Sequence, residues 1–249
     1  MHANPYAAPT SDLQELPSSQ VPTIAEALSR GYDFRIGELL GESWQRVKGI
    51  KGIVIGGFVI YYAALFAVSF VLGMLLGLFG LLNEADPLGM AVGQLIISML
   101  AAALTYPFLA GLNMVGIRRA ADQPVSFNEM FSHFGRLAPL LVTAILMMLL
   151  VYVGFLLLII PGIYLSVAYM LAIPLVVERG LSPWQALETS RKAISQHWFK
   201  VFGLFLLLGL ILGLSAIPLG IGLIWTIPLF VVALGVLYRI IFGVLPPTH

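Results

Sequence analysis

Residues 201–243 decide the fold class of this chain, and they read VFGLFLLLGLILGLSAIPLGIGLIWTIPLFVVALGVLYRIIFG. Arg239 is the only charged side chain among them. A helix needs about 20 apolar residues to cross the ~30 Å hydrocarbon core of a bilayer. The stretch is therefore too long for one crossing, and Pro218 and Gly220 supply turn residues near its middle. We expect a hairpin of two transmembrane helices.

Three further apolar segments cover residues 53–82, 87–117 and 137–177, and Pro161-Gly162 interrupts the last of them. Counting the interrupted segment as a hairpin predicts six transmembrane helices arranged as three hairpins. Residues 162–177 would span only about 24 Å at 1.5 Å per residue. Re-entrant hairpins are therefore the alternative to full crossings. We favour full crossing in a locally thinned bilayer, because the charge changes cleanly at each flank.

The composition agrees with an all-helical integral membrane protein. Of the 249 residues, 59% are hydrophobic and 10% are charged, whereas soluble domains carry roughly 45–50% and about 25%. So few charges exclude both a soluble globule and a disordered chain. The absence of cysteine excludes disulfides, thiolate catalysis and Cys-ligated metals. A net charge of +1 argues against a nucleic-acid partner.

The basic residues orient the predicted helices. All 13 Lys and Arg residues fall on one side of the arrangement, and the opposite connectors carry only Glu84 and Asp86. The positive-inside rule then places both termini in the cytoplasm. Residues 1–32 are rich in proline and polar side chains, so we expect a disordered cytoplasmic tail there, followed by a membrane domain over residues 33–243. Residues 244–249 form a second short cytoplasmic tail in this interpretation.

An amphipathic segment that opens with a capping residue precedes each hairpin. The capping residues are Asp33, Ser126 and Ser182. Glu129 and Gln185 stand three residues after the two serines, which is the spacing of a capping box. These segments predict interfacial helices that lie along the cytoplasmic leaflet.

The second helix of every predicted hairpin carries a proline, at Pro107, Pro174 and Pro228. A proline inside a helix removes one backbone hydrogen bond and kinks the helix. Prolines are also common in transmembrane helices in general. Their similar placement nevertheless favours a threefold repeat over residues 33–117, 126–177 and 182–243.

Basic and aromatic side chains near the cytoplasmic face are candidates for contact with lipid headgroups. A basic residue near an anionic membrane surface contributes about 1 kcal/mol of attraction. The same charges also determine topology, so the two roles are compatible. The candidates are Arg118, Arg119, Arg191, Lys192, Trp184 and Trp198.

Groups that carry chemistry are scarce inside the predicted spans. Arg239 is the one ionisable side chain there other than tyrosine, and we expect it to snorkel to the cytoplasmic headgroups. This argues against a proton-coupled transporter. Ser215 has no histidine in any span to activate it, so we interpret it as a small packing residue. We predict neither an enzyme nor a cofactor.

Two further patterns have structural interpretations. Glu129 and His133 lie one helical turn apart, and with His197 they could form a metal site, but we favour a pair of solvated histidines on the polar helix faces and no metal. Glycine pairs spaced by four residues are expected to pack helices inside the molecule, although one face could serve self-association. The pairs are Gly73 and Gly77, Gly89 and Gly93, and Gly209 and Gly213.

Three stretches resemble a signature of uncharacterised bacterial inner-membrane proteins. They are LIIPGIY at residues 158–164, IPLVVERG at 173–180 and SPWQAL at 182–187. Those families are similar to the membrane domain fused to some glycerophosphodiester phosphodiesterases. The segment NPYAAP at residues 4–9 also resembles tails of small multipass proteins of Gram-negative bacteria. The resemblance implies a six-helix domain in the inner membrane without a defined activity, since the catalytic domain has no counterpart here.

Two functions fit these patterns. The first is a non-enzymatic membrane protein that binds or moves a lipid or another amphipathic substrate, with membrane lipids as its partners. The second is an accessory or scaffold subunit whose helices bind a membrane-protein partner or a second copy of the chain.

Overall fold

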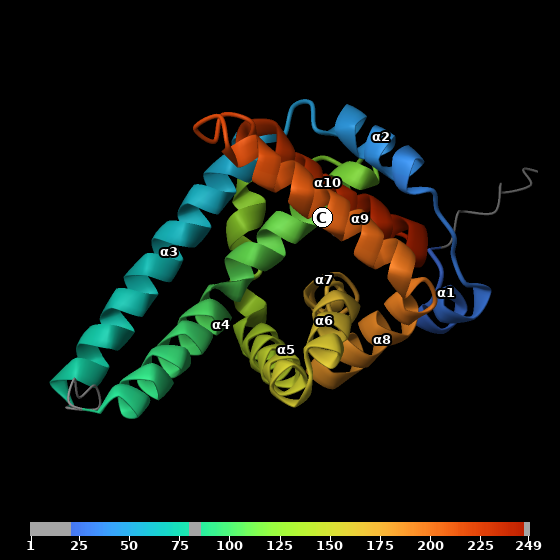
Figure 1. The fold of residues 1–249 in the computed structure, drawn as a ribbon. Coiled ribbons are helices and arrows are strands. Elements are labelled where there is room, and N and C mark those ends of the chain that lie inside the picture. Colours follow the sequence, from blue (N-terminus) through green and yellow to red (C-terminus); the bar gives the residue numbers. More distant parts are fainter. Residues whose placement is uncertain (1–20, 80–85, 247–249) are drawn as a thin grey trace, which may run out of the picture.

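The computed structural model describes residues 21–79 and 86–246, and every regular element in these residues is a helix (Figure 1). Six helical segments are long and apolar enough to cross a membrane. This confirms the predicted all-helical class and the six candidate spans. The spans are Lys51–Leu78, Pro87–Ala120, Phe127–Leu157, Ile159–Glu178, Trp198–Ala216 and Leu223–Phe242.

Several spans contain more than one element, and shorter helices lie between them. In chain order the elements are α1 (Ile24–Arg30), α2 (Ile36–Arg46), α3 (Lys51–Leu78), α4 (Pro87–Ala120), the 3-10 helices η1 (Phe127–Phe131) and η2 (Phe134–Arg136), α5 (Leu137–Leu157), α6 (Ile159–Ala168), α7 (Ala172–Glu178), α8 (Pro183–Ser195), α9 (Trp198–Ala216) and α10 (Leu223–Phe242).

The centre of the molecule is formed by α4 and α10, which pack extensively on each other. Helix α3 packs along α4, and α5 packs along α6. The α3–α4 pair extends away from the other helices toward the lower left of Figure 1, while α9 and α10 lie across its upper end. Helix α2 lies against α10. These contacts place α10 between the amphipathic α2 and the end of the α3–α4 pair.

Two glycines allow α4 and α10 to approach each other closely. A Cβ atom at Gly116 would lie 2.2 Å from the carbonyl oxygen of Val231, and one at Gly235 would lie 2.2 Å from that of Gly116. Only glycine fits where two helix backbones are this close. Neither position belongs to the glycine pairs that the sequence singled out.

The glycines predicted to pack helices inside the molecule do not do so in α3 and α9. Within residues 21–79 and 86–246, and apart from the backbone of the same helix and the adjoining residues, no atom lies within 4 Å of a Cβ built at any of Gly73, Gly77, Gly209 and Gly213. The prediction of internal packing is therefore wrong for these two pairs. Four-residue spacing shows that small residues share a helix face, but it does not show which way the face points.

The predicted disordered tail is wrong for residues 24–30, which form α1. Thr23 caps this helix, because its hydroxyl accepts from the Glu26 N–H at 3.3 Å while the Thr23 N–H donates to the Glu26 carboxylate at 2.7 Å. Arg30 then donates to the carbonyl oxygens of Ile240 and Ile241 at 3.2 and 3.1 Å. The capping box and this attachment to α10 order the segment. Residues 1–20 lie outside the described residues.

The second amphipathic segment also differs from its prediction. It forms η1 and η2 in place of one α-helix, and Ser126 makes no side-chain capping bond. The cause is packing on α4, because a Cβ at Gly111 would lie 2.7 Å from both the Glu129 carbonyl oxygen and the Met130 Cα. Met130 is buried by this contact. The third segment does form a helix, α8, in which the Ser182 N–H donates to the Gln185 side chain at 3.3 Å.

The three prolines occupy two kinds of position. Pro107 lies inside α4 and Pro228 lies inside α10. Pro174 does not, because a turn at residues 169–171 separates α6 from α7 and places this proline in the first turn of α7. Pro174 has no N–H to bond the carbonyl oxygen of Met170 four residues earlier, and the helix is interrupted at that point.

The Glu178-Arg179 dipeptide of the IPLVVERG stretch is structural. The Arg179 Nε lies 2.7 Å from the Glu178 carboxylate, and both side chains are buried. The Tyr238 hydroxyl and the Leu245 N–H donate to the same carboxylate, each at 2.6 Å. Arg179 also donates to the Phe242 carbonyl oxygen. The pair therefore fixes α7 to the end of α10 and to the segment that follows it.

Candidate functional site

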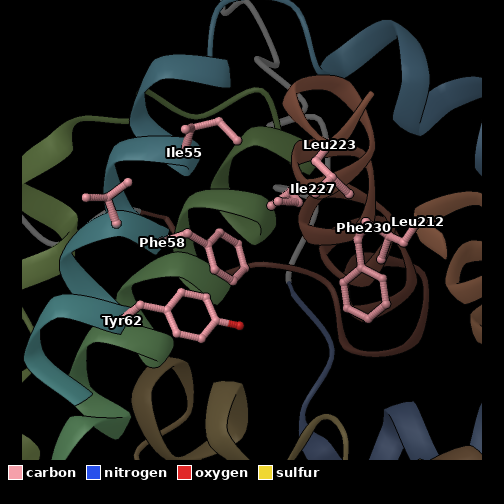
Figure 2. Close-up of a pocket in the computed structure, with 8 residues that line it drawn as sticks. Ile55, Phe58, Tyr62, Leu212, Leu223, Ile227 and Phe230 are labelled. Atoms are coloured by element: carbon pink, nitrogen blue, oxygen red, sulfur yellow. The ribbon is translucent and has the colours of Figure 1, made fainter. Parts of the chain in front are cut away.

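The candidate site is an apolar groove of about 670 Å³ between α3 and the α9–α10 pair (Figure 2). In Figure 2, Phe58 and Tyr62 project from α3 toward Phe230 and Leu212 on the opposite side. The lining residues are Ile55, Phe58, Val59 and Tyr62 from α3, Leu212 from α9, and Leu223, Ile227 and Phe230 from α10.

Helical periodicity explains why these side chains share the groove. The four α3 residues follow the spacing i, i+3, i+4, i+7 from Ile55, which places them on one face of the helix. The α10 residues follow i, i+4, i+7 from Leu223 in the same way. Two apolar stripes thus face a space that the chain itself leaves open, and Val59 remains 64% exposed.

A cation lies at one end of the groove. Lys51 begins α3 one helical turn before Ile55, and its Nζ lies 5.0 Å from the centroid of the Trp225 ring on α10. This is a cation–π contact, which leaves the ammonium able to donate to an anion. Among the described residues, none of the ion pairs includes Lys51. The groove is therefore apolar along its length and positive at its end.

A second, polar cavity of about 430 Å³ lies beside the end of α4 and is lined by Arg118, Glu129, His133, Arg136 and Glu178 among others. Glu129 is only 5% exposed and pairs with Arg118 at 2.9 Å and with His133 Nε2 at 3.1 Å. The interpretation of His133 and His197 as solvated polar side chains is therefore wrong for His133, whose ring is buried beside Glu129. No cluster of three or more metal-ligating side chains occurs in residues 21–79 and 86–246.

Arg239 does not snorkel to the headgroups as predicted. Its guanidinium pairs with Glu42 of α2 at 2.7 Å and donates to the Ala120 carbonyl oxygen at 2.5 Å. Glu42 also pairs with Arg46 at 2.7 Å, and Arg46 pairs with Asp122 at 2.6 Å. The hydrogen bond from Arg46 lowers the pKa of the Asp122 carboxyl. The network ties α2 to the ends of α4 and α10.

The four basic residues predicted to contact headgroups all have partners within the protein. Arg118 is held by Glu129, as described above, and Arg119 donates to the carbonyl oxygens of Arg46 and Lys48 at 2.9 and 2.8 Å. Arg191 and Lys192 both pair with Glu188, at 2.7 and 3.4 Å. The bond from Arg191 lowers the pKa of the Glu188 carboxyl. The structure does not gather these residues into one site.

The two tryptophans differ in their surroundings. Trp184 is exposed on α8. Trp198 stacks on Phe202 with ring centroids 5.0 Å apart, and its Nε1 donates to the Tyr164 carbonyl oxygen at 3.3 Å. Trp198, Tyr164, Phe199 and Phe202 also line a further apolar pocket of about 690 Å³. Trp198 is thus partly engaged in packing but keeps an apolar surface beside it.

Sequence reasoning missed the groove and its cation. Helix α3 is apolar on every face, so the stripe from Ile55 to Tyr62 does not stand out from its neighbours. Nothing in the sequence signals that Lys51 and Trp225, which are far apart in the chain, lie together. No family model, curated protein or solved structure matches the chain.

Proposed function

We propose that this chain is a non-enzymatic integral membrane protein that binds phospholipid, with one acyl chain in the groove of Figure 2. The observation that supports this most strongly is an apolar groove of about 670 Å³ with the Lys51 ammonium at one end. A phospholipid has the same division, with an apolar chain joined to an anionic phosphate. The proposed location is the bacterial inner membrane, with both termini in the cytoplasm and α2 and α8 along the cytoplasmic leaflet.

The chemistry of the groove supports binding more than catalysis. An acyl chain that enters the groove leaves other lipids and not water, so it does not gain the roughly 0.8 kcal/mol per methylene group of transfer from water. Its binding free energy comes mainly from van der Waals contact with the groove walls. Near a membrane surface a basic residue adds about 1 kcal/mol toward an anionic headgroup. The eight lining side chains include no carboxylate, imidazole, thiol or amine that could act as a nucleophile or general base.

Filling the groove should reduce lipid retention. We expect Val59→Trp, which places an indole in the groove, to lower the phospholipid that copurifies with the protein several-fold. The measurement is lipid mass spectrometry on protein extracted in mild detergent. Val71→Trp is the matched control, because Val71 is a valine on the same helix, 54% exposed and outside the groove. Equal lipid retention by the two variants contradicts the proposal.

Lys51 should set the preference for charge. We expect Lys51→Gln to keep the bound acyl chain but to reduce the ratio of anionic to zwitterionic lipid several-fold, because the ammonium at the groove end is lost. The ratio is measured in the same preparations. An unchanged ratio would show that the cation does not face the headgroup.

Lipid movement is a separate property from lipid binding. Reconstitution into vesicles that carry a fluorescent phospholipid in one leaflet measures transbilayer movement. Transport is assigned to the groove if transbilayer movement of the phospholipid exceeds that in protein-free vesicles and if Val59→Trp, but not Val71→Trp, reduces it. Retention without movement limits the function to binding.

An accessory or scaffold subunit is the second candidate. It is favoured by the outward-facing Gly209 and Gly213 of α9, because small residues on an open helix face allow another helix to approach closely. A stoichiometric protein partner that is lost on Gly209→Ile with Gly213→Ile, together with no retained lipid, would favour this candidate over the first.

A further inference from the structure

Both ends of α10 lie at the same end of the α3–α4 pair. Trp225, near the start of α10, lies under Lys51, the first residue of α3. Arg239, near the end of α10, donates to the carbonyl oxygen of Ala120, the last residue of α4. The two helices of this pair run side by side, since a Cβ at Gly57 would lie 2.8 Å from a Leu112 methyl group, so Lys51 and Ala120 mark the same end.

This arrangement makes α10 a transverse helix. Trp225 and Arg239 are 14 positions apart, or about 21 Å at 1.5 Å per residue. A helix that crossed the bilayer beside α3 and α4 would run parallel to them. Trp225 and Arg239 would then lie about 21 Å apart along the pair, with one of them close to its opposite end. Both ends stay at one end of the pair, so α10 runs across it (Figure 1).

The end that α10 crosses is the basic end of the pair. Lys48 precedes α3 and Lys51 is its first residue, while Arg118 and Arg119 lie in the last turn of α4. By the positive-inside rule this end faces the cytoplasm. The start of α10 and the preceding turn therefore belong to the cytoplasmic side, not to the periplasmic side where a fully crossing hairpin would place them.

The turn between α9 and α10 has side chains suited to lipid. Residues 216–222 read AIPLGIG and contain no polar side chain. Ile217, Leu219 and Ile221 are all exposed on the protein surface, and Leu219 is 95% exposed. A turn that emerged into water would hold these side chains against solvent, whereas hydrocarbon receives them without cost.

The backbone of this turn is also suited to lipid. In hydrocarbon each unsatisfied backbone N–H costs several kcal/mol, because no water replaces the missing bond. The N–H groups of Leu219, Gly220 and Ile221 donate to carbonyl oxygens within the turn at 2.9, 2.9 and 3.1 Å. Ile217 donates to Leu214 at 3.3 Å, and Pro218 has no N–H. The turn therefore satisfies these donors without water.

We infer that α9 and α10 form a re-entrant hairpin in the cytoplasmic leaflet and do not cross the membrane. The exposed apolar face of α9, which includes Leu206, Leu210 and Leu214, then contacts the acyl chains of that leaflet. A fully crossing hairpin and a re-entrant hairpin both return to the side of the membrane from which they start. The orientation proposed for the termini is therefore the same in both cases.

The position of the hairpin also determines which leaflet supplies the lipid, a step that rests on the proposed function. The groove lies between the first turns of α3 and this hairpin, with Lys51 at its end. If the hairpin stays in the cytoplasmic leaflet, the groove opens to that leaflet and takes its phospholipid from there.

Crosslinking tests the transverse position of α10. The chain has no native cysteine, so a cysteine pair is the only reactive pair in each variant. We expect Lys51→Cys with Trp225→Cys to be joined by a bifunctional maleimide whose reach is under half of the ~30 Å hydrocarbon thickness. A fully crossing hairpin separates the two positions by that thickness and prevents the crosslink.

Two control pairs make either result decisive. Asp33→Cys with Lys200→Cys replaces an exposed ion pair of 2.5 Å and should crosslink. Lys51→Cys with Leu88→Cys joins opposite ends of the α3–α4 pair and should not. Absence of the Lys51–Trp225 crosslink, while the Asp33–Lys200 pair reacts in the same membranes, overturns the inference.

Labelling from outside the cell gives an independent test. We expect a membrane-impermeant maleimide to label Leu88→Cys in intact spheroplasts and to leave Ile217→Cys unlabelled. External labelling of Ile217→Cys overturns the inference. The crosslinking and labelling results do not depend on whether the protein retains lipid. A failure of the proposed lipid function can therefore be distinguished from a failure of the re-entrant hairpin.

Discussion

Replacing Arg118 with methionine is expected to lower the free energy of unfolding by about 3–5 kcal/mol, because it leaves a buried carboxylate without its strongest partner. Glu129 is 5% exposed and lies 2.9 Å from the Arg118 guanidinium. His133 Nε2, at 3.1 Å, is the other side-chain partner of this carboxylate. The measurement is unfolding by SDS titration of the protein in mixed micelles, followed by loss of helical circular dichroism.

A double variant and a surface control separate charge burial from loss of side-chain volume. Arg118→Met with Glu129→Gln removes the stranded charge and should recover most of the lost stability. Arg191→Met breaks a partly exposed pair with Glu188 and should cost about 0–1 kcal/mol. Equal losses for Arg118→Met and Arg191→Met would show that the Glu129 site is not effectively buried.

The sequence predicts the number of helices well wherever the length of an apolar stretch determines it. The stretch 201–243 needs two helices because one cannot contain it, and α9 and α10 occupy it. The same reasoning fails to orient the helices, because apolar length gives no sign of what lies beside each helix. That α10 crosses the end of the α3–α4 pair depends on contacts such as that of Arg239 with Ala120, which join distant parts of the chain.

Local patterns fail where tertiary packing overrides them. Ser126 and Glu129 have the spacing of a capping box, but Gly111 brings the backbone of this segment against α4, and Glu129 turns inward to Arg118. Thr23 and Glu26 have the same spacing and do form a capping box, because α1 packs as a helix on the end of α10. The pattern is identical in the two places, and the neighbouring helix decides the outcome.

The largest backbone effect is expected at the crossing of α4 and α10. We expect Gly116→Ala to lower the free energy of unfolding by about 3 kcal/mol, at the upper end of the usual cost of overpacking. The new Cβ would lie 2.2 Å from the Val231 carbonyl oxygen and 2.9 Å from its carbonyl carbon. These are backbone atoms, so no side-chain rotation relieves the contact, and the two helices must separate. SDS titration measures the loss.

Gly209→Ala is the matched control for this crossing. It makes the same substitution in an apolar helix, at a position where no other part of the described chain comes within 4 Å of the added Cβ. Alanine favours a helix over glycine by about 0.8–1.0 kcal/mol in water, so the control should be neutral or slightly stabilising. If Gly116→Ala were as stable as Gly209→Ala, α4 and α10 would not be in backbone contact. The transverse position of α10, which closes the groove on one side, would then lose its main packing contact.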